Sequence, residues 1–248
     1  MFDLNLPHVL DSIGDDHRVL DVGGWAKPFT RADWVVDIMP YDNRGWAGRQ
    51  GPERERFSRD SWVQMDVNSK ERLPFEDKFF DFVVCSHTLE DIRDPVFLCS
   101  ELNRVAKRGY LETPSMLAEL AFGTESRAYA GYYHHRWLVE MDPSRARVVF
   151  LMKPHFIHGS WQYHIPKRMC RRLTPQQRVT WLFWEGGFGY MERVEIDMVT
   201  FKRILLEFVR HQGAYPDWRY ATIPPAEKLG QIRNLIGTHA RRALGGVR

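Results

Sequence analysis

Five short apolar runs, each closed by a turn or a polar side chain, organise the first half of the sequence. Between the fourth and fifth runs, residues 95–107 place apolar side chains at helical spacing. Strands that alternate with crossovers are typical of a parallel α/β sheet, and a run that is apolar almost throughout is typical of a central strand covered on both faces. The expected strands are residues 18–22, 34–37, 62–66, 79–85 and 109–113.

The second half of the sequence predicts antiparallel strands instead. The turn signal at residues 142–145, Asp-Pro-Ser-Arg, separates two apolar runs at 136–141 and 147–152, which predicts a β-hairpin. Two further apolar runs, 179–184 and 191–196, flank a pair of glycines and predict a second hairpin that completes the sheet.

Two amphipathic helices are expected near the end of the sequence. Apolar residues fall on one helical face around 201–209 and again around 226–243. The second of these helices is expected to pack on the sheet or to make the contact of a homodimer.

Composition excludes several classes of protein. The 248 residues are 44% hydrophobic, which suits one globular domain, and no apolar run approaches the ~18 residues of a membrane helix. The first five residues lack the features of a secretion signal. The three cysteines cannot pair completely and lack metal-ligand spacing, so neither a disulfide scaffold nor a zinc module is expected. A reducing, cytoplasmic location is the expectation.

Charge is distributed unevenly along the chain. Residues 1–124 carry 15 Lys and Arg against 22 Asp and Glu, whereas residues 125–248 carry 20 against 10. The basic half is expected to form a solvated face or to attract an anionic small-molecule substrate. No recognised nucleic-acid module accompanies it, so no nucleic-acid partner is expected.

Polar and glycine residues follow the predicted strands where ligands bind in an open parallel sheet, beyond the carboxyl ends. The glycines after Asp21 let the backbone approach a ligand closely, and Asp37 is placed to accept ribose hydroxyls. Asp66 can accept the amino group of adenine. The set predicts a nucleoside ligand.

The same series of residues resembles the S-adenosylmethionine-dependent methyltransferases with a Rossmann-like sheet, in particular the type 11 branch. The resemblance rests on residues 19–24, 35–37, 65–67, 73–77, 80–84, 86–95 and 101–105.

The resemblance implies a Rossmann-like α/β fold with a mostly parallel sheet, an antiparallel C-terminal hairpin and a β-hairpin substrate cap. The chain would be one domain, 1–248. Within it, residues 1–113 would bind the cofactor, an insert at 114–178 would cap the substrate, and residues 179–248 would complete the fold.

The implied cofactor is S-adenosyl-L-methionine, which leaves as S-adenosyl-L-homocysteine. Asp21 and the two glycines would line its methionine part, Asp37 its ribose and Asp66 its adenine. The expected contacts are Asp21, Gly23, Gly24, Trp25, Asp37, Asp66, Val67, Ser86 and His87.

Two departures from the family pattern concern the first loop. Trp25 and Lys27 stand where the family usually has glycine, and about ten residues separate the first two strands. That length is too short for a full crossover helix, so a loop must replace it.

The acceptor is expected near a segment rich in tyrosine and histidine. In related methyltransferases a histidine in this region often faces the acceptor, and a neutral imidazole can remove a hydroxyl proton. The candidate bases are His135, His134 and His87, and the candidate substrate contacts are Tyr132, Tyr133, Arg136 and Trp137. The expected reaction is biosynthetic O-methylation of a polar metabolite such as a sugar, glycoside or nucleotide-linked sugar.

Four alternatives stay open or are set aside. The acceptor atom can be nitrogen or carbon, and a non-catalytic methyltransferase-like scaffold is the alternative from another class. His155, His158 and His164 have no neighbouring carboxylate in the sequence, so no metal is expected. The Tyr-x-x-x-Lys spacing of short-chain dehydrogenases at 163–167 is rejected, because Pro166 would break the helix it needs.

Overall fold

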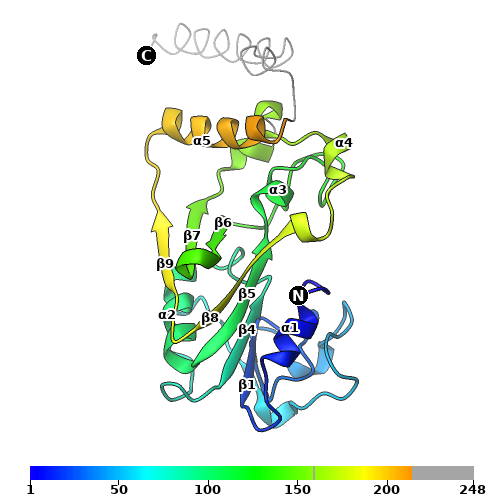
Figure 1. Ribbon diagram of the computed structural model, residues 1–248, viewed down its shortest axis with the longest axis vertical. Helices are drawn as coiled ribbons and strands as arrows, with labels where there is room; N and C mark the ends of the chain where they lie inside the picture. The colour runs from blue at the N-terminus through cyan, green and yellow to red at the C-terminus, as the bar shows by residue number, and fades with distance from the viewer. Residues whose placement is uncertain (159, 214–248) are drawn as a thin grey trace, which may run out of the picture.

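In the computed structural model, which describes residues 1–158 and 160–213, a six-stranded sheet lies at the centre of the molecule (Figure 1). The strand order is β3-β2-β1-β4-β5-β8; β1 to β5 run parallel and β8 runs antiparallel to β5. This confirms the mostly parallel, Rossmann-like sheet. The strands are β1 (Val19–Val22), β2 (Trp34–Asp37), β3 (Trp62–Gln64), β4 (Phe82–Ser86), β5 (Arg108–Pro114) and β8 (Val179–Glu185).

Both faces of the sheet are buried at its centre, which explains why β1, β2 and β4 are mostly apolar. Alternate side chains of each strand enter two separate cores, and α1 (Leu6–Asp11) and α2 (Pro95–Val105) lie on opposite sides (Figure 1). The core on the α2 side contains Leu20, Val83 and Leu111; the core on the α1 side contains Val19, Phe82 and Tyr110.

A loop connects β1 to β2, as the spacing predicted. All residues between β1 and β2 are described, and they form no helix. Between β2 and β3 stand the 3-10 turns η1 (Tyr41–Asn43) and η2 (Arg59–Ser61). The helix predicted at 95–107 is α2, which begins where the Asp94 side chain accepts the Phe97 N–H and Pro95 occupies the first turn.

The first predicted hairpin is present as β6 (Trp137–Asp142) and β7 (Arg147–Met152), joined by the 3-10 turn η3 (Pro143–Arg145). One face of this hairpin belongs to the main core beside α2, through Trp137, Val139, Val148 and Phe150. The hairpin is therefore part of the layer that covers the central sheet.

The second predicted hairpin is wrong. Strands occupy both expected positions, but β8 pairs with β5, whereas β9 (Gly189–Arg193) pairs in parallel with β7 in a separate sheet of order β6-β7-β9. Asn103 of α2 explains the separation, because its side chain exchanges hydrogen bonds with the backbone of Phe188 at 2.8 and 3.1 Å. The connection is thereby held against α2, and the chain passes to the other sheet.

Three helices and a set of 3-10 turns form a third core. The helix predicted around 201–209 is confirmed as α5 (Met198–His211), which buries Phe201, Leu205 and Val209. The helix predicted at 226–243 lies outside the described residues. Within the described part of the chain, no helix has the length and apolar character needed to cross a membrane. The remaining elements are α3 (Met116–Glu119), α4 (Lys167–Cys170), η4 (His155–His158), η5 (Trp161–Tyr163) and η6 (Gln176–Arg178).

A matched pair of substitutions on β7 tests whether the hairpin is part of the core. Phe150 is 0% exposed and Met152 is 60% exposed. We expect Phe150→Ala to lower the free energy of unfolding by about 3–4 kcal/mol, because a buried ring leaves a cavity. Met152→Ala should cost less than about 1 kcal/mol. Urea denaturation measures both; equal, small losses would show that the hairpin is a loosely attached cap.

Candidate functional site

A cavity of about 310 Å³ opens beyond the carboxyl ends of β1 and β4. It brings together five of the predicted cofactor contacts: Asp21, Gly23, Gly24, Ser86 and His87. The other lining residues are Met1, Ala26, Lys27 and Gln50. Lys27 is one of the two departures from the family's glycine pattern, and it contributes to the cavity wall.

Both glycines after β1 are required by close contacts. Gly23 has φ +79°, and a Cβ there would lie 1.9 Å from Thr88 Oγ1. A Cβ on Gly24 would lie 2.2 Å from Asp21 Oδ2. Only glycine leaves this wall of the cavity as bare backbone.

Asp21 is a buried carboxyl in the wall of the cavity. Its Oδ2 accepts the Phe29 N–H at 2.9 Å, which holds the loop that replaces a crossover helix. Burial raises the pKa of Asp21 to about 7, although this hydrogen bond opposes the shift. A buried carboxyl with a raised pKa favours a cation beside it, because the cation stabilises the charged form of the carboxyl.

Asp37 ends β2 and fixes the same loop from the other side. Its Oδ2 accepts the Trp25 N–H at 2.9 Å, its Oδ1 accepts the Met39 N–H at 2.8 Å, and burial raises its pKa. The Trp25 indole donates to the side-chain and main-chain oxygens of Asn43. Trp25 therefore has a structural role that the sequence did not reveal.

Asp66 and Val67 lie apart from the cavity. Because β3 ends at Gln64, Asp66 falls in an exposed turn, where its Oδ1 accepts the backbone and side-chain N–H groups of Asn68. Val67 packs against the main core. The described residues that line the cavity include neither Asp37 nor Asp66, so their predicted contacts with the cofactor stay predictions.

Glu112, at the end of β5, was missed by the sequence analysis. Its fully buried carboxylate accepts hydrogen bonds from the Phe2 N–H at 2.7 Å, from Ser86 Oγ at 3.2 Å and from the Tyr110 hydroxyl. His87 Nε2 lies 3.0 Å from its Oε1. Burial alone would raise the pKa of Glu112, but His87 and the other donors lower it to about 2. A glutamate inside an apolar strand was the available signal.

His87 stands between two carboxylates. Its backbone is left-handed, with φ +57°, and its Nδ1 lies 3.4 Å from Glu90 Oε1. Burial opposes protonation, yet Glu112 and Glu90 raise the pKa of His87 to about 9. An imidazole that keeps its proton at neutral pH does not accept one from a substrate, so the geometry disfavours His87 as the base.

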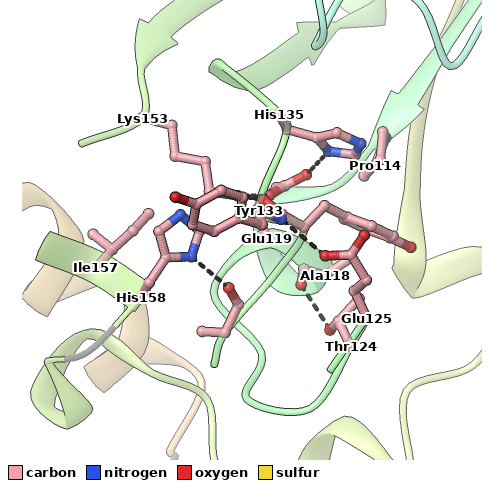
Figure 2. Close-up of polar contacts among 12 residues, drawn as sticks. Pro114, Ala118, Glu119, Thr124, Glu125, Tyr133, His135, Lys153, Ile157 and His158 are labelled. Carbon is pink, nitrogen blue, oxygen red and sulfur yellow. Dashed lines mark hydrogen bonds and ion pairs between the residues drawn. The ribbon is translucent and has the colours of Figure 1, made fainter. Parts of the chain in front are cut away.

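A second buried carboxylate, Glu119 of α3, organises the segment that contains the other two histidines. Its Oε1 lies 2.5 Å from His135 Nδ1, and its Oε2 accepts a hydrogen bond from Lys153 Nζ at 2.5 Å (Figure 2). Lys153 also donates to the carbonyl of Tyr132, whose ring stacks on His135 with centroids 4.4 Å apart. Glu119 and Lys153 were not predicted, and they hold His135 in place.

The two histidines meet at one aspartate. His135 Nε2 lies 3.7 Å and His134 Nε2 lies 3.8 Å from Asp91 Oδ1. His134 Nδ1 lies 3.4 Å from Glu125 Oε1. Burial, and next the charge of Glu90, raises the pKa of Asp91. Asp91 follows His87 by four residues in the same connection, so this cluster is joined to the cavity wall.

The predicted substrate contacts divide into three groups. Tyr133 and Arg136 are exposed; the Tyr133 N–H donates to Glu125, and the Tyr133 ring lies against His158 with centroids 5.5 Å apart (Figure 2). Tyr132 lies against both histidines, stacked on His135 and edge-on to His134. Trp137 is a core residue, since its ring is buried and its Nε1 donates to the Ile92 carbonyl at 2.8 Å. The position of Trp137 gives no support to a substrate contact.

Comparison with protein families matches a segment that contributes part of the cavity wall, through Gln50, Ser86 and His87. Residues 35–111 match the family model described as "Methyltransferase domain". The match confirms the resemblance to S-adenosylmethionine-dependent methyltransferases and supports S-adenosylmethionine as the cofactor. None of the curated proteins matches the chain in sequence.

Solved methyltransferase structures share part of the fold at low identity. A Mesorhizobium loti S-adenosylmethionine-dependent methyltransferase is 14% identical, with 60% of this chain and 63% of that one covered and a TM-score of 0.35. A Haloferax volcanii protein, solved in complex with the Trm112 methyltransferase activator, is 19% identical (44% and 50% covered, TM-score 0.33). An Aquifex aeolicus methyltransferase is 19% identical (46% and 65% covered, TM-score 0.29). The chain thus spans about half to two thirds of these structures.

The charge state of His87 can be tested directly. We expect its imidazole to titrate near pH 9 in an NMR experiment, and Glu112→Gln to lower this pKa because one anion is lost. The raised pKa means that the ion pairs of His87 stabilise the fold fully below pH 6.5 and are lost as the pH rises through 9. Titration of His87 near 6.5 in the unmodified protein would contradict the assignment.

Proposed function

We propose that this chain, whose residues 35–111 match the methyltransferase-domain family, is an S-adenosylmethionine-dependent methyltransferase that methylates a hydroxyl oxygen of a polar small metabolite. One observation carries the proposal: the glycine-walled cavity beyond β1 and β4 is joined, through the turn from His87 to Asp91, to a pair of histidines. The cavity suits the methyl donor, and the region around the histidines suits the methyl acceptor.

The residues of the cavity fit the methionine part of the cofactor. Bare backbone at Gly23 and Gly24 permits close approach, and any side chain there would fill the space. The carboxyl of Asp21 favours the ammonium and sulfonium charges, while Lys27 offers a cation to the carboxylate. The positive charge of Lys27 would then replace the backbone contact that the family's glycine makes with the cofactor.

The ribose and adenine are assigned to the ends of β2 and β3. Each carboxylate oxygen of Asp37 accepts one backbone N–H and has a second lone pair for a ribose hydroxyl. Asp66 is exposed beyond β3 and is available to the adenine amino group. These roles are carried over from the family pattern.

The acceptor end supports a hydroxyl. When bound, S-adenosylmethionine supplies an electrophilic methyl group, and the acceptor must be held in line with it and shielded from water. A hydroxyl oxygen must also lose its proton. Glu119 accepts from Nδ1 of His135, and Glu125 Oε1 lies 3.4 Å from Nδ1 of His134, so the Nε2 atom of each ring faces Asp91. Two imidazole nitrogens beside one carboxylate favour an acceptor that must lose a proton.

We infer the substrate class from two exposed side chains next to the histidines in the sequence. Exposed Tyr133 suits stacking on a sugar ring or base, and exposed Arg136 suits a phosphate or carboxylate. A sugar, glycoside or nucleotide-linked sugar combines these features and implies a biosynthetic role. Residues 114–178 would shape this end, with β6 and β7 anchored in the core. Three free, buried cysteines accord with a cytoplasmic location.

Two glycine substitutions test the donor site by calorimetric titration of S-adenosylhomocysteine. We expect micromolar binding by the unmodified chain and at least tenfold weaker binding by Gly24→Ala, because the added methyl group displaces Asp21. Gly187→Ala is the matched control, since a Cβ there would make only ordinary contact, 3.6 Å from Asn103. It should bind as the unmodified chain does.

Circular dichroism checks that both variants are folded. Absence of binding by the folded, unmodified chain would contradict the methyltransferase proposal and favour the non-catalytic scaffold. Equal binding by Gly24→Ala and Gly187→Ala would contradict the placement of the cofactor.

A further inference from the structure

We propose that Asp91, His134 and His135 bind a divalent first-row transition-metal ion, with Zn²⁺ the best match to the donor set. The three side chains offer one carboxylate oxygen and two imidazole nitrogens, all within 4.8 Å of one another. Spacing along the chain does not predict this site, because Asp91 is more than forty residues from the histidines.

The distances between the three donor atoms suit an ion better than direct contacts. Asp91 Oδ1 lies 3.7 Å from His135 Nε2 and 3.8 Å from His134 Nε2, too far for hydrogen bonds. Among the described residues, the buried Asp91 Oδ1 has no hydrogen-bond partner. Two ligands of one ion, each about 2.0–2.2 Å from it, lie up to about 4 Å apart. A single ion would satisfy all three atoms.

The outer sides of both imidazoles are oriented as in known metal sites. His135 Nδ1 lies 2.5 Å from Glu119 Oε1, and His134 Nδ1 lies 3.4 Å from Glu125 Oε1. A carboxylate only accepts, so the proton of each neutral ring belongs on Nδ1 and the lone pair on Nε2. Metal-bound histidines regularly donate their other nitrogen to a carboxylate in this way.

Buried neighbours preorganise one of the ligands. Glu119 is fixed by Lys153 (Figure 2). The ring of Tyr132 stacks on His135, so His135 is held on two sides. His134 is 58% exposed and can adjust by the few tenths of an ångström that coordination requires. His135 is thus a rigid ligand and His134 an adjustable ligand, and both face Asp91.

The histidines considered from spacing alone are engaged elsewhere. His158 Nδ1 and His164 Nε2 each contact a backbone carbonyl, of Ala130 and Ile157 respectively. Neither belongs to the group around Asp91.

Two imidazoles and one carboxylate form the ligand set of catalytic zinc, which keeps a coordination position for water or substrate. Asp91 is 39% exposed and His134 58% exposed, so the group is reachable from solvent. The role of the ion rests on the proposed function. A bound acceptor hydroxyl would lose its proton to solvent more readily as the O–CH₃ bond forms and the S–CH₃ bond breaks.

Zinc titration of the full chain, after removal of metals by a chelator, tests the site without methyl transfer. We expect one Zn²⁺ per chain with micromolar or tighter affinity. Asp91→Asn and His134→Ala should each weaken binding at least tenfold, and His8→Ala, an exposed histidine of α1, should leave it unchanged. Co²⁺ gives a second readout, because its visible absorption reports coordination by protein ligands.

No zinc binding by the unmodified chain, or equal binding by the unmodified chain, Asp91→Asn and His134→Ala, would overturn the site. Titration of S-adenosylhomocysteine into the same variants separates this outcome from failure of the proposed function. Neither substituted residue lines the cofactor cavity, so cofactor binding should persist in both.

Discussion

The buried carboxylate of Glu112 is the interaction on which the rest of the site depends. Removing a charged carboxylate from water costs several kcal/mol unless it is paired and fully hydrogen-bonded. Here the offsetting donors come from β4, from β5 and from the segment before α1, so one side chain ties three parts of the chain together. It also holds His87 in a left-handed conformation at the mouth of the cavity.

A second buried carboxylate is paired in the same way beside the two histidines. Glu119 is buried and paired with Lys153 and His135, much as Glu112 is paired with His87. Between the two lies the turn that carries Glu90 and Asp91, where both Glu90 oxygens and Asp91 Oδ1 are buried and accept no hydrogen bond from the described residues. Glu90 is paired with His87 at 3.4 Å, so Asp91 is the carboxylate left to bind the proposed ion.

Periodicity predicted much of the fold, because alternation of apolar residues reports burial directly. The five parallel strands, α2, the first hairpin and α5 all follow from it. It failed at β8 and β9, since an apolar pattern shows which face is buried and not which strand is the partner; Asn103, far away in sequence, holds their connection against α2. For the site, the glycines after β1 and the residues that end β4 predicted part of the cavity wall, whereas Glu112, Glu119 and Lys153 gain meaning only from tertiary partners. Trp25 and Trp137 illustrate the converse, as side chains with suggestive positions that serve the fold.

We propose that S-adenosylmethionine binds between Gly23 and His87, with its methyl group facing the histidine pair. A crystal structure of the chain with S-adenosylhomocysteine is the direct test. We expect the homocysteine part to lie against the backbone of Gly23 and Gly24, with the sulfur on the side of His87 and Asp91. The result that would contradict it is a ligand in the larger groove of about 510 Å³ between β6 and β8, which is lined by residues such as Met116, Val139 and Phe208.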